Sequence, residues 1–599
     1  MSGKYPTVRR SQVITTWGPG ALIDLPKDAG IVGSLDSWSY PDGFDKMEIK
    51  DQRISQKLAL LMGIASPRLY APPPDTAAPG EKDGGISVRR FPEWFLVQEK
   101  TAQNGNLRSR RLVPRKALDE RRRFEKLEVV PTRFVRACPN GHVADLPWRR
   151  FVHQEIKNGC MQQLWLDEQG TGGDLGDLTV RCECGASRGL HEAAEFESFA
   201  LGRCPGARPW IGWDAREQCD LPGRLLIRTA ANAYFPQVLS ALSLPNKQTG
   251  LTKIVAELWD FLEMVDDESD LAFFKKKPKI AAKLVNQNDS DVVAAIKQLK
   301  SGGSAERPVK QVELDALLDV PEGFGDDVPV DPNFHARRLP EMIWRKTSLS
   351  DPIAAVTQVH RLREVLALTG FTRFEAVVPD IDGEYDTDLV RAELADEPKW
   401  FPAVENRGEG IFLLLDPQAV KDWLARAEVQ TRVVRLREGF DRWAAERQIE
   451  RPYPGGPYVL LHTLSHLLLQ SLSMRCGYPA SSIRERIYID PEGDRYGLML
   501  YTASSDAEGT LGGLVQQARD VEAHLATALR SGGLCSNDPI CAQHTPGEGF
   551  EARWLHGAAC HGCALIAETS CEMRNDHLDR ALVVPTLAEP DAAFFATVQ

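Results

Sequence analysis

The chain has 599 residues, of which 43% are hydrophobic and 26% are charged. This excludes a disordered or fibrous protein and requires several packed domains rather than one core. The formal net charge is −12, which excludes a protein that coats nucleic acid with its whole surface, so any DNA contact must come from a local basic patch.

The start of the chain and its apolar runs predict a cytoplasmic protein with no membrane anchor. No run approaches the roughly 18 apolar residues of a membrane span. Polar residues such as Ser11 and Gln12 stand where a signal peptide would be apolar. In a reducing compartment, we expect the twelve cysteines to be metal ligands or packing groups rather than disulfides.

Residues 1–130 are expected to form a mixed α/β region. Short β-prone pieces between Ser11 and Pro26 surround a Gly18-Pro19-Gly20 turn. The glycine spacing is not that of a phosphate-binding loop, so we expect a plain tight turn. The proline- and glycine-rich stretch from Tyr70 to Gly85 predicts an exposed loop.

A basic segment at residues 108–126 has nine basic and three acidic residues. Its excess of positive charge makes it the best candidate for contact with DNA phosphates. The alternative is a solvated helix face on which Asp119, Glu120 and Glu125 pair with arginines. The residues expected to contact DNA in the first case are Arg108, Arg110, Arg111, Arg115, Lys116, Arg121, Arg122 and Arg123.

The cysteines fall into two clusters, which predicts two zinc sites. Six lie between Cys138 and Cys219, five lie between Cys535 and Cys571, and only Cys476 stands apart. Randomly placed packing cysteines would rarely gather in this way. We therefore expect two structural Zn²⁺ ions, each in its own subdomain.

The first cluster assigns a zinc-binding domain to residues 131–250, with irregular structure around the metal. Glycine or proline beside a cysteine allows a tight turn whose N–H groups point at sulfur. The expected ligands are Cys138, Cys182, Cys184 and Cys204, with His142 as the main substitute. The choice between Cys138, His142 and Cys160 stays open, and Cys160 and Cys219 have simple packing as an alternative role.

The middle of the chain predicts a helical region and linker over residues 251–345. Apolar periodicity predicts helices over residues 251–300, with the lysine run Lys275 to Lys279 in a loop. Prolines and glycines between Ser301 and Pro332 predict a domain boundary.

Residues 346–599 are expected to form a C-terminal α/β domain. The patterns predict helices at Asp351 to Leu368, Tyr458 to Met474 and Leu511 to Leu529, and a strand at Gly497 to Thr502. The fold class is therefore a mixed α/β multidomain protein with two structural zinc-binding subdomains embedded in α+β domains.

The second cysteine cluster predicts a four-cysteine zinc module at residues 535–580. The two-residue spacer between Cys560 and Cys563 lets both sulfurs face one tetrahedral ion. Cys571 is the expected third ligand, and Cys535 or Cys541 supplies the fourth. Four thiolates leave no position for an activated water, and the chain has no HExxH or deaminase motif, so the site is expected to be structural.

Two other features have a functional and a structural interpretation. His462 and His466 are an i, i+4 pair that could share a metal, but the third ligand is not evident and the helix is apolar nearly all round. We therefore expect buried core histidines. The glycines from Gly509 to Leu514 could bind an anion at a helix start, but a structural loop is the favoured interpretation.

The C-terminal motif resembles a domain of unknown function found at the C-terminus of superfamily-2 DNA helicases. That domain has the pattern GCxxC-x7-C followed by N-x-x-LDK and is a four-cysteine zinc module. The matching residues here are Cys560, Cys563, Cys571, Asn575, Leu578 and Asp579, with Arg580 in place of the lysine. The chain has no Walker A sequence and no helicase core.

The opening SQVITTWGPGALIDLP and the CPNGH segment at Cys138 extend the resemblance over nearly the whole chain. They are similar to the DrmB family of the DISARM anti-phage systems. The resemblance implies a non-catalytic zinc-binding subunit that partners a DrmA-type superfamily-2 helicase, which contributes the ATPase. It also implies that the complex, possible further DISARM components included, binds and remodels foreign DNA.

Two other functions stay open at the level of sequence. One is a zinc-dependent nucleic-acid hydrolase in which His142, His462 or His466 completes an open metal site. The other is a pure protein-interaction scaffold that makes no contact with DNA.

Overall fold

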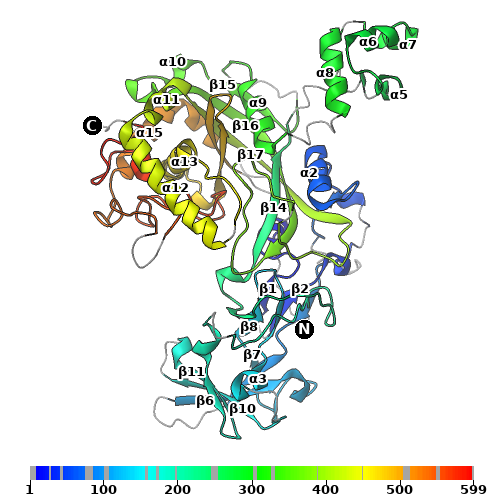
Figure 1. The fold of residues 1–599 in the computed structure, drawn as a ribbon, viewed down its shortest axis with the longest axis vertical. Helices are drawn as coiled ribbons and strands as arrows, with labels where there is room; N and C mark the ends of the chain where they lie inside the picture. The colour runs from blue at the N-terminus through cyan, green and yellow to red at the C-terminus, as the bar shows by residue number, and fades with distance from the viewer. Residues whose placement is uncertain are drawn as a thin grey trace.

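The computed structural model describes residues 8–25, 28–40, 43, 45–74, 85–99, 107–154, 159–169, 174–195, 199–244, 254–255, 257–285, 287–300, 307–324, 331–387, 389–447, 449–502, 513–547 and 553–595. Helices and strands are mixed along the chain, as expected from the sequence. A large sheet lies at the centre, smaller sheets lie below it, and a small group of helices lies to one side (Figure 1). Among the described residues, no helix has both the length and the apolar character of a membrane span.

The central sheet has seven strands gathered from distant parts of the chain (Figure 1). Five follow one path, and two short strands pair with its long members: β15 with β16, and β3, in parallel, with β17. The path is β14 (Phe235–Leu242), β16 (Ile353–Thr372), β17 (Trp400–Leu415), β19 (Arg495–Thr502) and β18 (Ile483–Asp490), and the short strands are β15 (His335–Arg338) and β3 (Arg68–Tyr70). Each of the four regions expected from the sequence therefore contributes a strand to this sheet.

Strand β16 shows where the sequence-based prediction was wrong, because a helix was expected at Asp351 to Leu368. The strand is paired with β14 and β15 on one edge and with β17 on the other. Most of its second half is buried on both faces, so its apolar residues do not alternate as those of a half-exposed strand do. Its alanines, leucines and charged residues are good helix formers, and the pairing overrides this preference.

The core of the C-terminal part forms around α13 (Gly456–Cys476), which confirms the helix expected at Tyr458 to Met474. It packs on β18, β19 and α15 (Val521–Gly532) and is buried on nearly every side. The expected strand at Gly497 to Thr502 is confirmed as β19. The expected helix at Leu511 to Leu529 corresponds to α14 (Gly513–Gln516), a 3-10 turn and α15.

Two more helices, α11 (Pro417–Leu424) and α12 (Ala427–Arg447), cover the same region (Figure 1). Trp423 and Leu436 contribute buried side chains from these helices to the core around α13. The C-terminal metal-ligand residues are thus set beside the largest hydrophobic core of the molecule.

The N-terminal region begins with a helix, α1 (Arg10–Thr15), where short β-prone pieces were expected. The Gly18-Pro19-Gly20 turn follows it, and buried Arg373 donates hydrogen bonds to Gly20 O (2.7 Å) and to Gly141 O (2.8 Å). Arg373, which follows β16, thus joins the end of that strand to the Gly18-Pro19-Gly20 turn and to the turn at Gly141. The first strands and the next helix are β1 (Leu22–Leu25), β2 (Asp28–Val32), α2 (Gln52–Met62) and β4 (Val88–Arg90).

Two further sheets form the lower part of the molecule in Figure 1, so the cysteine-rich stretch is more regular than expected. One sheet has the order β12 (Ser187–Gly189), β11 (Leu178–Cys182), β10 (Leu164–Gln169), β6 (Leu107–Pro114), β5 (Trp94–Val97) and β7 (Val129–Pro131). The other has β13 (Arg224–Ile227), β8 (Phe134–Ala137) and β9 (Val143–Asp145), and α3 (Trp148–His153) follows it.

The helices expected between residues 251 and 300 are confirmed as a small group with its own core. They are α5 (Trp259–Leu262), α6 (Glu268–Phe274), α7 (Pro278–Lys283) and α8 (Asp289–Lys300). The lysine run lies mainly in the short connection between α6 and α7. The proline- and glycine-rich stretch that follows contains α9 (Val309–Leu318), whose Leu314 and Leu317 pack with residues of the central sheet, and α10 (Glu341–Trp344) lies further along the chain.

Two predicted loops lie mostly outside the described residues. They are the stretch Tyr70 to Gly85, of which residues 75–84 are not described, and the glycine-rich segment Gly509 to Leu514, of which only Gly513 and Leu514 are described.

Candidate metal centres

Four cysteines converge near the C-terminus on a single point. The sulfurs of Cys535, Cys541, Cys560 and Cys563 all lie within 4.8 Å of one another. Three of their separations are 3.5 Å (Cys535 to Cys560), 3.7 Å (Cys560 to Cys563) and 3.8 Å (Cys541 to Cys563). Zn–S bonds of about 2.3 Å in a tetrahedron place sulfurs about 3.8 Å apart, so this group, the C-terminal group, fits zinc.

The local backbone holds these sulfurs in the manner of a zinc knuckle. Gly562 N–H donates to Cys560 Sγ at 3.3 Å and Asn537 N–H donates to Cys535 Sγ at 3.4 Å. Such N–H···S contacts stabilise thiolates. Burial opposes ionisation of Cys560, but the hydrogen bonds from the Asn537 side chain and from Gly562 outweigh it and lower its pKa to about 7.

Two residues that follow the cysteines, Asp579 and Arg580, organise the chain around the group. Asp579 is completely buried and binds Arg432 of α12 through two hydrogen bonds of 2.7 and 3.2 Å. Arg580 forms an ion pair with Asp538, which lies in the loop between Cys535 and Cys541. The segment matched by resemblance therefore anchors the cysteine loop to the α12 and α13 core.

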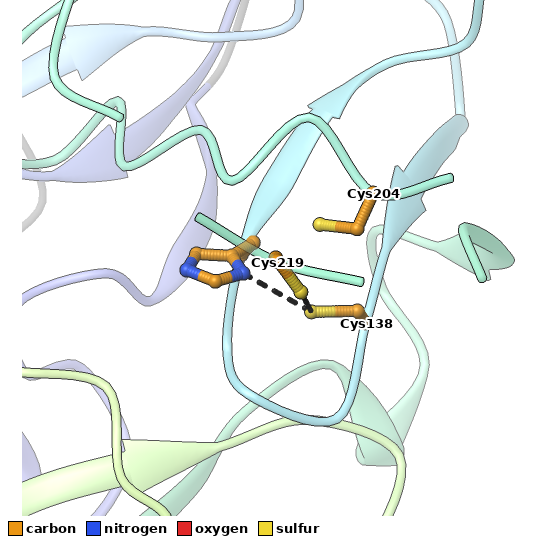
Figure 2. A group of neighbouring side chains, drawn as sticks. Cys138, Cys204 and Cys219 are labelled. Atoms are coloured by element: carbon orange, nitrogen blue, oxygen red, sulfur yellow. Dashed lines mark hydrogen bonds between the residues drawn. The ribbon is translucent and has the colours of Figure 1, made fainter. Parts of the chain in front are cut away.

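A second group lies beside β8 and comprises Cys138, His142, Cys204 and Cys219. Figure 2 shows its three cysteines. Cys138 Sγ is 3.3 Å from His142 Nδ1 and 4.0 Å from Cys219 Sγ. The other ring nitrogen, Nε2, lies 2.5 Å from Glu217 Oε1. A carboxylate on the far nitrogen is the usual support of a metal-binding histidine, because it leaves the near nitrogen with its lone pair free.

Gly206 allows this group, the β8 group, to close. Its φ is +62°, and a Cβ at this position would lie 1.7 Å from Glu217 O, so only glycine fits. Gly206 N–H donates to Cys204 Sγ at 3.4 Å. Hydrogen bonds from Cys138 and from Gly206 N–H lower the pKa of Cys204 to about 4, which favours a thiolate.

A third group lies between α3 and the end of β11 and comprises His153, Cys160, Cys182 and Cys184. His153 Nε2 is 3.2 Å from Cys184 Sγ, and Cys160 Sγ is 3.6 Å from Cys182 Sγ. His153 Nδ1 donates to Arg149 O at 2.7 Å, which again leaves the nitrogen beside sulfur with its lone pair. Hydrogen bonds from Ala186 N–H and from Cys182 lower the pKa of Cys184 to about 7. We call this the α3 group.

The structure divides the N-terminal residues differently from the single site expected from the sequence. Cys138 and Cys204 lie in the β8 group, whereas Cys182 and Cys184 lie in the α3 group. Each pair is completed by one histidine and by one cysteine, Cys219 or Cys160, for which the sequence also allowed a packing role. The number of cysteines could have indicated that histidines take part. Two sites with four ligands each need eight ligands, and this part of the chain has six cysteines.

Cys571 also lies apart from the group expected for it. Its sulfur is 3.1 Å from His462 Nε2 below α13, while both Cys535 and Cys541 complete the C-terminal group. The sequence left the choice between Cys535 and Cys541 open, and the structure brings both into the group because Cys571 lies with His462, His466 and Glu485 instead.

The basic segment 108–126 is not a helix, so the helical part of that alternative was wrong, but Asp119 and Glu125 pair with arginines as it expected. Its first part is β6, and a 3-10 turn at Arg115–Ala117 follows it. Among the eight predicted cations, ion pairs within the described residues involve Arg110 with Glu168, Arg111 with Glu99 and Glu125, Arg115 with Glu93, Arg122 with Asp28, and Arg123 with Asp119. Arg108, Lys116 and Arg121 are exposed and have no ion pair among the residues described.

Comparison with known families matches two parts of the chain. Residues 9–235 match a family described as "Domain of unknown function (DUF8724)", and residues 464–564 match a family described as "MrfA Zn-binding domain". The second range contains all four cysteines of the C-terminal group, so the zinc-binding character of that family agrees with the geometry described above.

A known relative covers most of the chain. The sequence is 30% identical over 495 residues to the DISARM protein DrmB of Bacillus paralicheniformis, and the alignment covers 78% of this chain and 82% of that protein. The similarity therefore extends well beyond the zinc-binding domain.

Proposed function

Because this chain belongs to the family of the DISARM protein DrmB, we propose that it is a non-catalytic, zinc-stabilised subunit of a DISARM anti-phage complex. In this proposal it partners a DrmA-type superfamily-2 helicase, and the complex binds and remodels foreign DNA. The sequence has no Walker A motif, so the ATPase belongs to the partner.

The observation that carries the non-catalytic role is the number of protein ligands in each group. The C-terminal, β8 and α3 groups each bring four thiolate or imidazole ligands together. A zinc ion with four protein ligands keeps no position for a water or substrate, whereas catalytic zinc sites have three protein ligands and an open position. The three groups therefore support ions that hold the fold together.

The route to DNA in this proposal runs through a small part of the basic segment. Arg108, Lys116 and Arg121 are exposed and without ion pairs among the described residues, so they are available to phosphates. The other predicted cations have carboxylate partners that would compete with DNA. We therefore propose that these three residues contribute the phosphate contacts of this subunit within the complex.

A zinc-dependent hydrolase remains the second candidate only because of His142, His462 and His466. His142 belongs to a group with four protein ligands, and His462 and His466 are both 0% exposed. A DNA phosphate cannot reach His462 or His466 unless the core unfolds. This weighs against a hydrolase.

The test is purification of the tagged chain together with its genomic neighbours. We expect a stable complex with a helicase, ATPase activity in the complex and in the helicase but not in this chain, and ultraviolet crosslinks from this chain to DNA. Cleavage of DNA or hydrolysis of ATP by the isolated chain would overturn the proposal. A stable complex without crosslinks to this chain would favour a protein-interaction scaffold instead.

A further inference from the structure

A fourth convergence of ligand atoms lies inside the C-terminal core. His462 and His466 come from one face of α13, Glu485 comes from β18, and Cys571 comes from the chain after the C-terminal group. Their ligand atoms all lie within 4.8 Å of one another, and all four residues are buried. His462 Nε2 is 2.9 Å from Glu485 Oε1 and 3.1 Å from Cys571 Sγ, and His466 Nε2 is 3.3 Å from Glu485 Oε1.

The outer hydrogen bonds of the two imidazoles fix the nitrogens that face this centre. His466 Nδ1 lies 2.8 Å from Ala564 O, and His462 Nδ1 lies 3.4 Å from His577 O. A carbonyl oxygen only accepts hydrogen bonds, so both Nδ1 atoms carry the proton. In neutral imidazoles both Nε2 atoms then present lone pairs to the same point, which is the arrangement of metal-binding histidines with backbone support.

The other two groups are prepared in the same way. Asn575 N–H donates to Cys571 Sγ at 3.1 Å, which stabilises a thiolate. Ser465 donates a hydrogen bond to the second oxygen of Glu485, so Oε1 is the oxygen turned toward the histidines. Each of the four groups therefore has a supporting contact away from the centre and an electron pair toward it.

Without a metal this arrangement would be costly. Two imidazole lone pairs, a carboxylate and a sulfur, with all ligand atoms within 4.8 Å of one another, would repel one another unless protons were added. Since both Nδ1 atoms already donate, a proton on Nε2 makes an imidazolium, and two such cations would share one buried carboxylate. Buried charges with incomplete pairing cost several kcal/mol, roughly, per ion.

We propose that His462, His466, Glu485 and Cys571 bind a fourth metal ion, a divalent transition metal of which zinc is the best match. Two neutral imidazoles, one carboxylate and one thiolate balance a +2 charge, and nitrogen, sulfur and oxygen are all ordinary zinc ligands. With four protein ligands and no exposure, the ion is structural. It joins α13 to β18 and to the segment that follows the C-terminal group.

This site differs from the zinc-binding domain matched by comparison. The matched range, residues 464–564, contains the whole C-terminal group but neither His462 nor Cys571. It also changes the interpretation of the histidine pair, which the sequence alone favoured as simple core residues. The inference does not depend on the proposed defence function, because it concerns only the metal content of the chain.

The test is a metal count on the purified full-length chain by mass spectrometry, for zinc, iron, cobalt, nickel and copper together. We expect four metal equivalents per chain when all four groups are loaded, and one of them belongs to this site. The matched variants are Cys571→Ala and, as a control, Cys476→Ala, because Cys476 belongs to none of the four groups.

The informative quantity is the difference in metal equivalents per chain between each variant and the wild type. Cys571→Ala should lose one equivalent while Cys476→Ala loses none, and this difference does not depend on how fully the other groups are loaded. An unchanged count in soluble Cys571→Ala would overturn the proposal. If Cys571→Ala does not fold, the decision rests on the wild-type count of four against three.

Discussion

The N-terminal and C-terminal metal groups differ in how they relate to the hydrophobic core. The C-terminal group is tied to α12 through Asp579 and Arg432, and its cysteines form a small cluster beside the largest core of the described residues. The α3 group lies at the end of β11 in the separate six-stranded sheet, and its Cys184 is exposed. The comparison teaches that the same ligand chemistry can stabilise different amounts of structure. Loss of the metal should unfold the whole C-terminal part, whereas at the α3 group it should disturb only the structure nearby.

The largest effect is expected from breaking the C-terminal group. The double variant Cys560→Ser/Cys563→Ser removes half of its ligands and should forfeit on the order of 10 kcal/mol of apparent folding free energy. That exceeds the reserve of most domains, so the protein should be insoluble or lack the C-terminal fold by circular dichroism.

The matched comparison is Cys182→Ser/Cys184→Ser in the α3 group. We expect a soluble protein that has lost local order around α3, detected by limited proteolysis, with the rest of the fold intact. Equal loss of soluble protein in both double variants would break the distinction between the two regions.

The next effect concerns the ion pair that anchors the C-terminal group. Asp579→Asn removes the charge that faces buried Arg432 and leaves it only the longer contact with Glu589 at 3.6 Å. Because the two side chains are 0% and 3% exposed, this should cost about 3–5 kcal/mol. A clear fall in the midpoint of thermal unfolding is expected. Arg203→Gln is the control, since Arg203 and Asp220 are each 76% exposed and such a pair contributes at most about 1 kcal/mol.

A third prediction follows from the separation of the β8 group and the α3 group, and the measurement is the metal content of the chain. Cys204→Ala and Cys182→Ala should each lose one equivalent, and the double variant should lose two, because the cysteines belong to different groups. A single N-terminal site predicts instead that the double variant loses no more than either single variant.

The smallest effect is expected from the proposed DNA contacts. Replacing Arg108, Lys116 and Arg121 with Ala should leave the thermal midpoint unchanged and weaken DNA binding by the complex. Each lost phosphate contact should reduce the salt dependence of affinity by roughly one unit of slope. The control replaces three exposed arginines elsewhere, Arg437, Arg442 and Arg475, with the same change of charge. An equal loss of affinity in both triple variants would contradict a local DNA contact.

The helices show which parts of the fold local pattern could predict. The apolar run of α13 and the periodicity of residues 251–300 were sufficient, because a helix makes its backbone hydrogen bonds within its own segment. β16 could not be predicted in this way. Its partners β14 and β17 are remote in sequence, and its burial on both faces removes the period of two.

The sequence by itself determined that the protein binds metal through cysteines, because clustered cysteines beside glycine and proline have that chemistry wherever the chain folds. Only the tertiary structure decided which ligands share an ion. Cys182 and Cys204 are separated by the packing of two sheets, and Cys571 is turned toward a histidine pair more than 100 residues away in sequence. The physical reason is that the ligands of one ion must be close in space. Spacing along the chain predicts such closeness only for ligands within one turn of each other, and the fold decides it for all others.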